Sequence, residues 1–163
     1  MERRVRFFGL AGVLAALALL YAGWTNFAHT DADRCYACKR PIHAHSKTVA
    51  FTDGRSRLFC CPACALSQRQ QTGKPVSITQ LTSFLTGKAL APDNAFVVKA
   101  SDVNMCERTK ELTDAGKRPA DLRYDRCAPS LIAFAVRNDA VQFAREHGGE
   151  VMPFSQAAAA FTK

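Results

Sequence analysis

Five of the seven cysteines form two closely spaced sets with twenty-one residues between them. The first set is Cys35 and Cys38, and the second is Cys60, Cys61 and Cys64. Two short cysteine sets on separate turns are typical of sites where four thiolates converge on one cation. Scattered structural cysteines, which serve as small buried hydrophobes, would not cluster in this way. The spacing therefore predicts a metal site with five candidate ligands for four positions, and it does not decide between Cys60 and Cys61.

The second cysteine set also predicts the chemistry of its sulfur atoms. Cys60, Cys61 and Cys64 are expected at the N-terminus of a helix, where the dipole and free N–H groups favour thiolate over thiol. A spare sulfur beside the site suits Cu(I), which accepts two or three soft ligands and moves between proteins by ligand exchange. A closed structural Zn(II) that holds a small domain together is the alternative. Cu(I) and Zn(II) both remain open.

Three further sulfur residues lie in or beside a long irregular stretch, residues 101–130. Cys106 and Cys127 are candidates either for a metal role or for a disulfide that would contribute about 3 kcal/mol. Met105 next to Cys106 would make a soft pair for Cu(I), although a methionine also serves as core packing. A loop of this length in a compact domain is usually functional or disordered. We therefore include Met105, Cys106 and Cys127 among the candidate ligands.

The segment Cys61-Pro62-Ala63-Cys64 supports a rival hypothesis, because it follows a predicted strand and opens a predicted helix. A thiol–disulfide oxidoreductase presents its nucleophilic cysteine in this way. The pair Cys35 and Cys38 instead fits a metal site, and no thioredoxin-like βαβ start precedes the motif. The sequence has no paired-carboxylate, serine-elbow or phosphate-loop pattern. We therefore expect a protein that is not an enzyme.

The N-terminal region predicts a membrane segment. Residues 7–27 form a nearly uncharged run of about the length that crosses a hydrocarbon layer of roughly 30 Å. The arginines before this run would stay cytoplasmic, and Tyr21 and Trp24 suit the far interface. We expect residues 1–28 to be a single-pass inner-membrane anchor and residues 29–163 to be a periplasmic domain. A cleaved signal peptide is the alternative, and it also predicts export.

Composition narrows the classes of partner. The 163 residues carry a net charge of +8, with 48% hydrophobic and 22% charged residues. The basic residues do not form clusters interleaved with aromatic residues, so we expect no nucleic-acid partner. An exported domain meets oxidising conditions, and seven cysteines cannot all pair within one chain. A bound metal would hold such thiols as thiolate ligands.

Hydrophobic patterns and turn signals predict an α+β domain made of two β-β-α-β units. The first unit is expected as strands 48–51 and 57–59 joined by a turn at Asp53-Gly54, a helix from Pro62 to near Gly73, and strand 76–81. The second is expected as strands 96–100 and 131–136, a helix capped by Asn138 or Asp139 that ends at residues 147–149, and strand 150–154.

The cysteine spacing resembles the TRASH and YHS heavy-metal-binding modules. The matching residues are Cys38, Cys60 and Cys64, together with Phe59 just before the second cysteine set. Asp53-Gly54 lies where those modules turn their hairpin. The resemblance implies a treble-clef-like first unit, in which a hairpin and a helix hold the metal.

Downstream residues resemble the NosL family, copper-binding accessory proteins of nitrous oxide reductase. The matching stretches are residues 95–102, Met105 and residues 140–154 with their His-Gly-Gly-x-Val sequence. The two resemblances together cover roughly residues 35–154. They imply one NosL-like fold that carries metal chemistry on its first unit.

This chain departs from the NosL pattern at three places. Members of that family usually carry Cys-Gly-Met at the second cysteine, whereas this chain has Cys38-Lys39-Arg40. Their Met-Gly-His stretch aligns with Met105-Cys106-Glu107, which gains a thiol and loses the histidine. The predicted membrane anchor also replaces their usual lipid anchor. These changes move the donor set toward thiolate, which keeps Cu(I) and Zn(II) as the expected ions.

The sequence therefore predicts a membrane-anchored, exported metal-binding protein that acts as a copper or heavy-metal chaperone, as an accessory protein for metalloprotein maturation or metal transport, or as a metal sensor. By resemblance, the expected partner is an exported metalloprotein or a membrane metal transporter. A structural-zinc interaction module is the alternative, and the oxidoreductase is a further one. The expected ligands are Cys35, Cys38, Cys60, Cys61, Cys64, Met105, Cys106 and Cys127.

Overall fold

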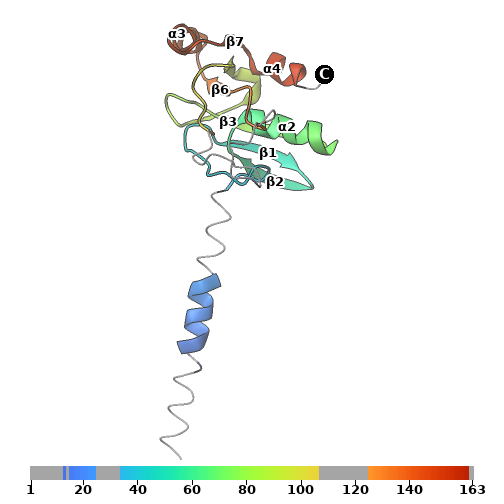
Figure 1. Cartoon of the computed structure of the whole chain (residues 1–163), viewed down its shortest axis with the longest axis vertical. Helices are drawn as coiled ribbons and strands as arrows, with labels where there is room; N and C mark the ends of the chain where they lie inside the picture. The colour runs from blue at the N-terminus through green and yellow to red at the C-terminus, as the bar shows by residue number, and fades with distance from the viewer. Residues whose placement is uncertain (1–12, 14, 25–33, 107–124, 162–163) are drawn as a thin grey trace, which may run out of the picture. The chain divides into compact units, whose positions relative to one another are not determined.

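The computed structural model describes residues 13, 15–24, 34–106 and 125–161 (Figure 1). The chain divides into two units, residues 1–33 and 34–163. In the first unit, residues 13 and 15–24 are helical, and the remainder of the predicted anchor lies outside the described residues. Within the part of the chain that the structure describes, no helix is both long and apolar enough to cross a membrane.

The second unit begins with an antiparallel sheet whose order is β2-β1-β3-β4. Its strands are β1 (Thr48–Thr52), β2 (Arg55–Phe59), β3 (Ser77–Thr82) and β4 (Ala89–Leu90). Helix α2 (Pro62–Thr72) joins β2 to β3. The predicted first β-β-α-β unit is present, with strand ends that differ by one or two residues.

The turn between β1 and β2 forms as predicted. Asp53 and Gly54 have φ values of 50° and 74°, and Thr52 pairs directly with Arg55. Positive φ at both central residues defines the turn that matches the twist of a two-residue hairpin. The Asp53 carboxylate accepts hydrogen bonds from the Tyr36 hydroxyl at 2.7 Å and from Lys74 Nζ at 2.8 Å. The hairpin tip is thereby tied to the first cysteine loop and to the segment that follows α2.

Helix α2 begins and ends at the residues that its sequence predicts. Pro62 occupies the first turn, and the Cys61 Sγ caps the helix by accepting a bond from the Cys64 N–H at 3.4 Å. Gly73 has φ 66° and donates its N–H to the Arg69 carbonyl. Proline at the start and a left-handed glycine at the end explain the length of this helix.

A second antiparallel sheet has the order β6-β5-β7, with strands β5 (Phe96–Lys99), β6 (Leu131–Phe134) and β7 (Glu150–Pro153). A 3-10 helix, η1 (Pro92–Asn94), precedes β5, and α3 (Arg137–His147) joins β6 to β7. In both sheets the first strand of the unit is central, so the β-β-α-β order occurs twice. The fold is thus a mixed α+β arrangement with two small antiparallel sheets.

Two predicted details of the second unit are wrong. Helix α3 is not capped by Asn138 or Asp139, because it begins at Arg137 and its cap residue, Val136, makes no side-chain capping bond. Phe154 does not extend β7 but begins an additional helix, α4 (Phe154–Ala160). Phe154 and Ala157 are buried and hold this short helix on the core. Tertiary packing of this kind cannot be predicted from local helix propensity.

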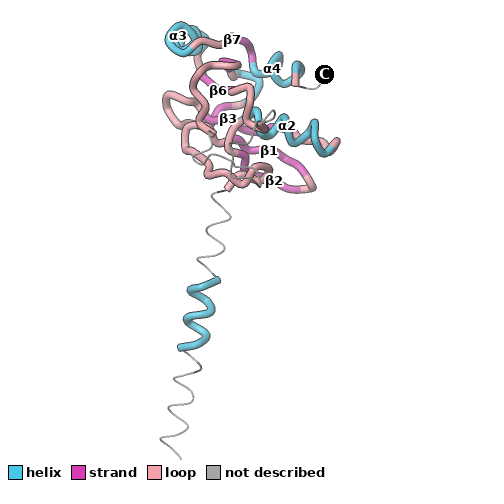
Figure 2. Tube along the Cα trace, in the orientation of Figure 1, coloured by secondary structure: helices cyan, strands magenta, loops and turns pink. Residues whose placement is uncertain are grey.

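The cysteines belong to the larger hydrophobic core. Helix α2 contacts β1, β2 and β3 and also β6, so it lies where the two sheets meet (Figure 2). All residues from Pro62 to Ser67 on this helix are buried. A smaller cluster around Phe134 and Phe143 fills the space between the second sheet and α3. The arrangement places the N-terminus of α2, with its cysteines, in the interior.

Candidate metal centre

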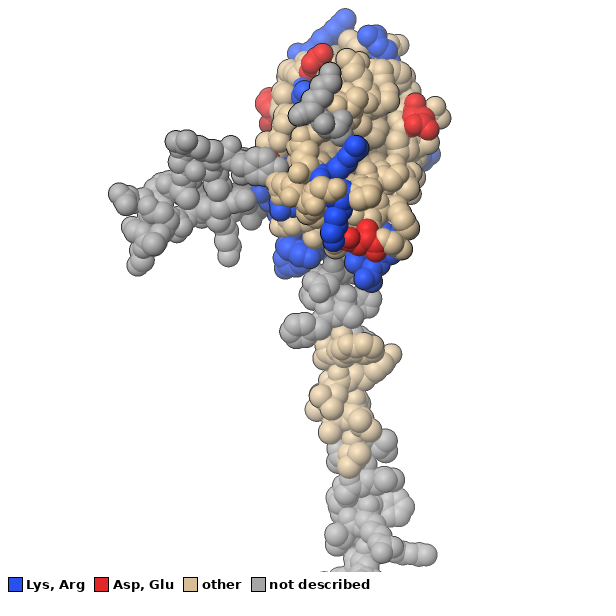
Figure 3. Space-filling model, turned by 90° about the vertical axis from the view of Figure 1, so that its right-hand side faces the viewer, with Lys and Arg blue, Asp and Glu red and all other residues tan. Residues whose placement is uncertain are grey.

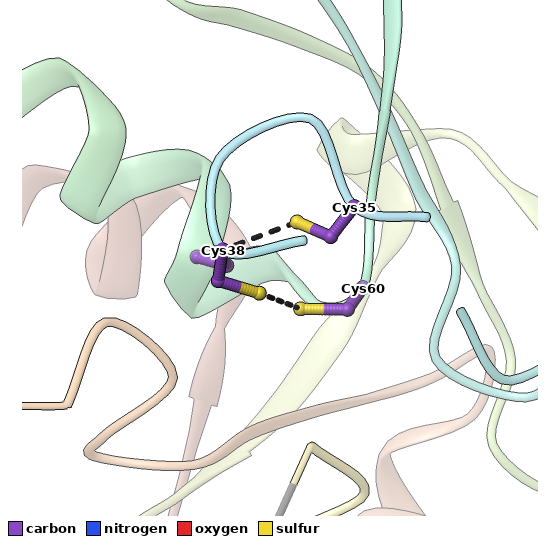
Figure 4. Close-up of side chains that lie close together, drawn as sticks. Cys35, Cys38 and Cys60 are labelled. Carbon is purple, nitrogen blue, oxygen red and sulfur yellow. Dashed lines mark hydrogen bonds between the residues drawn. The ribbon is translucent and has the colours of Figure 1, made fainter. Parts of the chain in front are cut away.

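Four cysteine sulfurs from two segments meet at the start of α2. The Sγ atoms of this first thiol group all lie within 4.8 Å of one another, and its members are Cys35, Cys38, Cys60 and Cys64. The Sγ–Sγ distance is 3.6 Å from Cys35 to Cys64 and 3.5 Å from Cys38 to Cys60. In Figure 4 the sulfurs of Cys38 and Cys60 point toward each other across the space between their segments.

The backbone explains why these sulfurs converge. The Cys35 N–H donates to the Arg40 carbonyl at 2.9 Å, and the Lys39 N–H donates to the Cys35 carbonyl at 3.0 Å. Lys39 has a φ of 61°, which closes this tight loop and brings Cys38 back toward Cys35. The Tyr36 N–H donates to Leu58 in β2 at 2.8 Å, so the loop is held beside the strand that leads to the second cysteine set.

These distances fit a tetrahedral thiolate site better than disulfides. A metal–sulfur distance of about 2.3 Å in a regular tetrahedron places its sulfurs about 3.8 Å apart. A disulfide bond requires about 2.05 Å. The distances of 3.5 and 3.6 Å lie close to the tetrahedral edge and well beyond a covalent bond. The first thiol group is therefore shaped for an ion that prefers four sulfur ligands.

A second thiol group shares Cys60 with the first. Its four members have Sγ atoms within 4.8 Å of one another and are Cys60, Cys61, Cys106 and Cys127. The Cys60 Sγ lies 3.6 Å from that of Cys127 and 4.0 Å from that of Cys61. All seven cysteines are free thiols in the structure, and these include Cys106 and Cys127. The first thiol group thus contains Cys60 and not Cys61, whereas the second contains both.

Matching backbone contacts position the two late cysteines. The Cys106 N–H donates to Asn104 Oδ1 at 3.0 Å, and the Cys127 N–H donates to Asp125 Oδ1 at 2.8 Å. Arg40 connects both segments to the first cysteine loop, because its guanidinium donates to the Cys106 carbonyl at 2.5 Å and to Asp125 Oδ2 at 2.6 Å. Sequence reasoning missed Arg40, since nothing local links residue 40 to residues 106 and 125.

Each thiol group holds one sulfur that favours the thiolate form. Hydrogen bonds from neighbouring thiols, chiefly Cys38, lower the pKa of Cys35. Hydrogen bonds from Cys106 and other thiols lower the pKa of Cys127 in the same way. The donors show the opposite shift: hydrogen bonding with Cys127 and Cys35 is the main cause that raises the pKa of Cys38 to about 11. The metal-free cluster therefore gathers negative charge on a few sulfurs while the others keep their protons.

The helix N-terminus does not by itself lower the pKa values of its three cysteines. The pKa of Cys64 is raised, chiefly by hydrogen bonding with Cys127, and that of Cys61 is raised chiefly by Cys106. For Cys60, hydrogen bonding with Cys106 lowers the pKa, but hydrogen bonding with Cys127, Cys35 and Cys38 outweighs it, so the pKa of Cys60 is raised. Crowding by other thiols exceeds the effect of the helix dipole here. Metal binding at these sulfurs must displace protons.

The charge of Arg40 is held beside the sulfurs. Burial acts to lower its pKa, but the hydrogen bond with Asp125 and the charges of Cys127 and Cys38 raise it above its usual range. The side chain is 13% exposed. A cation that remains protonated at this depth stabilises negative charge on nearby thiolates.

The remaining predicted ligand, Met105, lines a small cavity together with Cys61 and Cys106. His45 lines the same cavity, and its Nδ1 hydrogen-bonds with the Phe84 carbonyl at 2.6 Å. Within the irregular stretch 101–130, residues 107–124 lie outside the described residues. The structure thus brings all seven cysteines together and places Met105 at their edge.

Charged side chains are distributed differently from the sulfurs. On the face in Figure 3, Lys and Arg are spread among uncharged and acidic side chains. On this face, the described basic side chains are therefore not confined to one place.

No known protein family matches the sequence, and no curated protein does. Among solved structures, the chain is similar to the copper chaperone NosL from Shewanella denitrificans, with a TM-score of 0.52 and 15% identity. The similarity covers 77% of this chain and 90% of that chain. The chain has a NosL-like fold. The mercury-bound form of MerB2 is also similar, with a TM-score of 0.41 and 16% identity over 88% of this chain and 72% of that chain.

The NosL-like fold agrees with the resemblance drawn from residues 95–102 and 140–154, which form β5, α3 and β7 with their flanking residues. At 15% identity the similarity concerns the architecture. One fold carries many functions, so the chemistry of this chain depends on its own sulfur atoms.

Proposed function

We propose that this protein binds a soft heavy-metal ion through the first thiol group. The observation that carries the proposal is the convergence of four Sγ atoms from two segments within 4.8 Å, at distances suited to a tetrahedral site. Thiolate donors select Cu(I) and Zn(II) among the common biological metals. Cu(I) and Zn(II) are therefore the ions that we propose this group binds.

We further propose that the ion is cargo, and that Cys38 is the residue through which it is exchanged. Cys35, Cys60 and Cys64 have no exposed surface, whereas Cys38 is only half-buried. An incoming thiolate from an acceptor would reach the ion on the Cys38 side while the three buried sulfurs retain it. Cu(I) accepts two or three soft ligands, so it tolerates such an exchange. The shared architecture with a protein described as a copper chaperone supports this proposal.

The proposed setting and partner rest on the sequence. The arginines and the apolar run before residue 28 support export of the domain to the periplasm and an inner-membrane anchor. The proposed acceptor is accordingly an exported metalloprotein or a membrane metal transporter. We propose a binding protein and not a disulfide oxidoreductase. A redox nucleophile needs an accessible thiolate, whereas Cys61 is 5% exposed and has a raised pKa.

Anaerobic purification of the full chain, followed by element analysis and Cu(I) competition with a chromophoric chelator, tests the proposal. The expected result is bound metal that Cu(I) displaces and that a thiol acceptor removes. Cys38→Ser and Cys64→Ser should each weaken binding at the first thiol group. Met152→Leu is the matched control, because Met152 lies on β7 and is not among the expected ligands, and it should bind as the wild type does. Metal-free protein that takes up neither ion would contradict the proposal.

A structural Zn(II) site is the second candidate, and the burial of three of the four ligands favours it. Structural zinc sites are closed and four-coordinate. In that case zinc should stay bound against excess Cu(I), and its removal should unfold the domain. Ready exchange with retention of the fold would favour the chaperone.

A further inference from the structure

All seven cysteines form one continuous cluster in which a single sulfur belongs to both groups. The Cys60 Sγ lies 3.5 Å from that of Cys38 in the first thiol group and 3.6 Å from that of Cys127 in the second. Four sulfurs surround each of two neighbouring positions, and Cys60 is common to both sets. A thiolate has more than one lone pair available to metals, so one sulfur can bind two ions.

We propose that the second thiol group is a second metal site and that the Cys60 thiolate bridges the two ions. The inference rests on the proposed function, because it extends the same thiolate chemistry to Cys61, Cys106 and Cys127. The seven sulfurs then supply two four-coordinate sites. Sharing Cys60 gives the pair of sites one negative charge fewer than eight separate thiolates would.

The convergence of the second group is a tertiary arrangement of distant segments. Cys60 and Cys61 join β2 to α2, whereas Cys106 and Cys127 come from the two ends of the segment that follows β5. Ser67 Oγ on α2 donates to the Arg126 carbonyl at 2.9 Å, and Arg126 donates to Gln68 Oε1 at 2.7 Å. These bonds hold Cys127 against the helix that carries the other sulfurs.

Burial and charge favour an ion over neutral packing of these thiols. All four members of the second group are buried, with exposures between 0% and 5%. Small apolar residues would fill such a space equally well, yet four sulfurs lie within 4.8 Å. The nearly buried guanidinium of Arg40 adds a positive charge. It donates hydrogen bonds to the Cys106 carbonyl and to the Asp125 carboxylate, two residues before Cys127. A cation beside a thiolate cluster offsets its surplus negative charge.

The two sites would differ in how readily their bound ions exchange with an acceptor. The first group has the half-buried Cys38, whereas every member of the second group is buried. The ion in the second group would hold residues 104–106 and 125–127 on α2, as structural ions do in small domains. The ion in the first group would remain the transferable one.

The test uses the full chain, prepared anaerobically with reductant and loaded with ¹¹³Cd(II). Native mass spectrometry counts the ions, and ¹¹³Cd NMR detects scalar coupling through a shared sulfur. The expected result is two cadmium ions per chain with two mutually coupled resonances. Cys127→Ser should retain one ion and lose the coupling. Met152→Leu, on β7 and not among the expected ligands, should keep two coupled ions.

The alternative outcomes separate the two proposals. One ion per wild-type chain would overturn the second site and leave the proposed function standing. Two ions without coupling would overturn the bridging role of Cys60. No bound ion would overturn both proposals. Because count and coupling are read on wild-type protein, the test does not depend on whether Cys127→Ser folds.

Discussion

The guanidinium of Arg40 lies 2.6 Å from the carboxylate of Asp125, across eighty-five residues of sequence. This ion pair joins the loop of Cys38 to the segment of Cys127, and each thiol group has a member on one of these two segments. Asp125 also fixes the Cys127 N–H, so the pair orients a sulfur as well as a charge. The arrangement of the cluster therefore depends on a contact outside it.

Arg40→Met should lower the free energy of unfolding by on the order of 2 kcal/mol, because it removes the ion pair with Asp125 and the hydrogen bond to the Cys106 carbonyl from a side chain that is only 13% exposed. The second thiol group should lose its ion before the first does. Urea unfolding combined with metal counting measures both effects. Lys74→Met is the matched control: it breaks the solvent-screened pair with Asp53 and should cost less stability than Arg40→Met. Equal losses in the two variants would contradict the role of Arg40.

Cys38→Ser should discriminate between the two proposed ions. The three sulfurs that remain in the first thiol group suffice for Cu(I), whereas Zn(II) prefers four ligands. We expect zinc affinity at this group to fall by more than the 10–100-fold typical of an outer-shell change, and Cu(I) affinity to fall less. Competition titrations with chelators of known affinity measure the two losses. A larger loss for Cu(I) would contradict this assignment.

Metal binding should strengthen as pH rises. The pKa of Cys38 is raised from 9.0 to about 11, so its thiol is protonated between pH 7 and 9 in the metal-free protein and must lose a proton on binding. Each displaced proton makes affinity rise about tenfold per pH unit. Calorimetry in buffers of different ionisation enthalpy counts the protons, and Cys38→Ser should release about one fewer. An unchanged count would show that Cys38 is not a ligand.

The same shift has a consequence for stability without metal. A raised pKa means that the folded protein keeps a proton that the unfolded chain loses near pH 9.0. The contribution of Cys38 to stability is therefore complete below pH 9 and declines as pH rises toward 11. Unfolding midpoints of reduced, metal-free protein should fall across this interval, and Cys38→Ser should fall less. A wild-type midpoint that rises instead would contradict the shift.

Gly149→Ala should destabilise the second sheet strongly. A Cβ at this position would lie 2.7 Å from the Lys99 carbonyl oxygen and 2.8 Å from Val98 Cγ1, with φ at +96°. Steric overlap together with unfavourable φ predicts a loss of about 3 kcal/mol. Gly73→Ala is the control, because its φ is also positive but nothing lies within 4 Å, and about 1 kcal/mol is expected. Similar unfolding midpoints for the two variants would contradict the close approach of β7 to β5.

Local rules predicted much of the first unit. Asp53-Gly54 determines its own turn, and Pro62 and Gly73 mark the two ends of α2. The start of α3 was placed too late because Val136 provides no side-chain signal, and α4 was missed because its stability comes from the burial of Phe154. In these two places, packing decides the structure.

For the candidate site too, the sequence predicts one part, and the packing of distant segments decides the rest. The cysteine spacing predicted that Cys35 and Cys38 would meet the later set, since two short thiol pairs have few other uses. It did not place Cys60 in both groups and Cys61 in the second alone, because the second group depends on Cys127, sixty-seven residues after Cys60. The role of Arg40 likewise requires the positions of segments that are remote in sequence. Contacts of this range follow from the packed fold and not from spacing.

The most direct test of the central claim is X-ray absorption spectroscopy of the anaerobically loaded full chain at the zinc or copper edge. The structure predicts a first coordination shell of sulfur only, at about 2.3 Å for Zn(II). A shell with nitrogen or oxygen ligands, or protein that carries disulfides in place of bound metal, would contradict it.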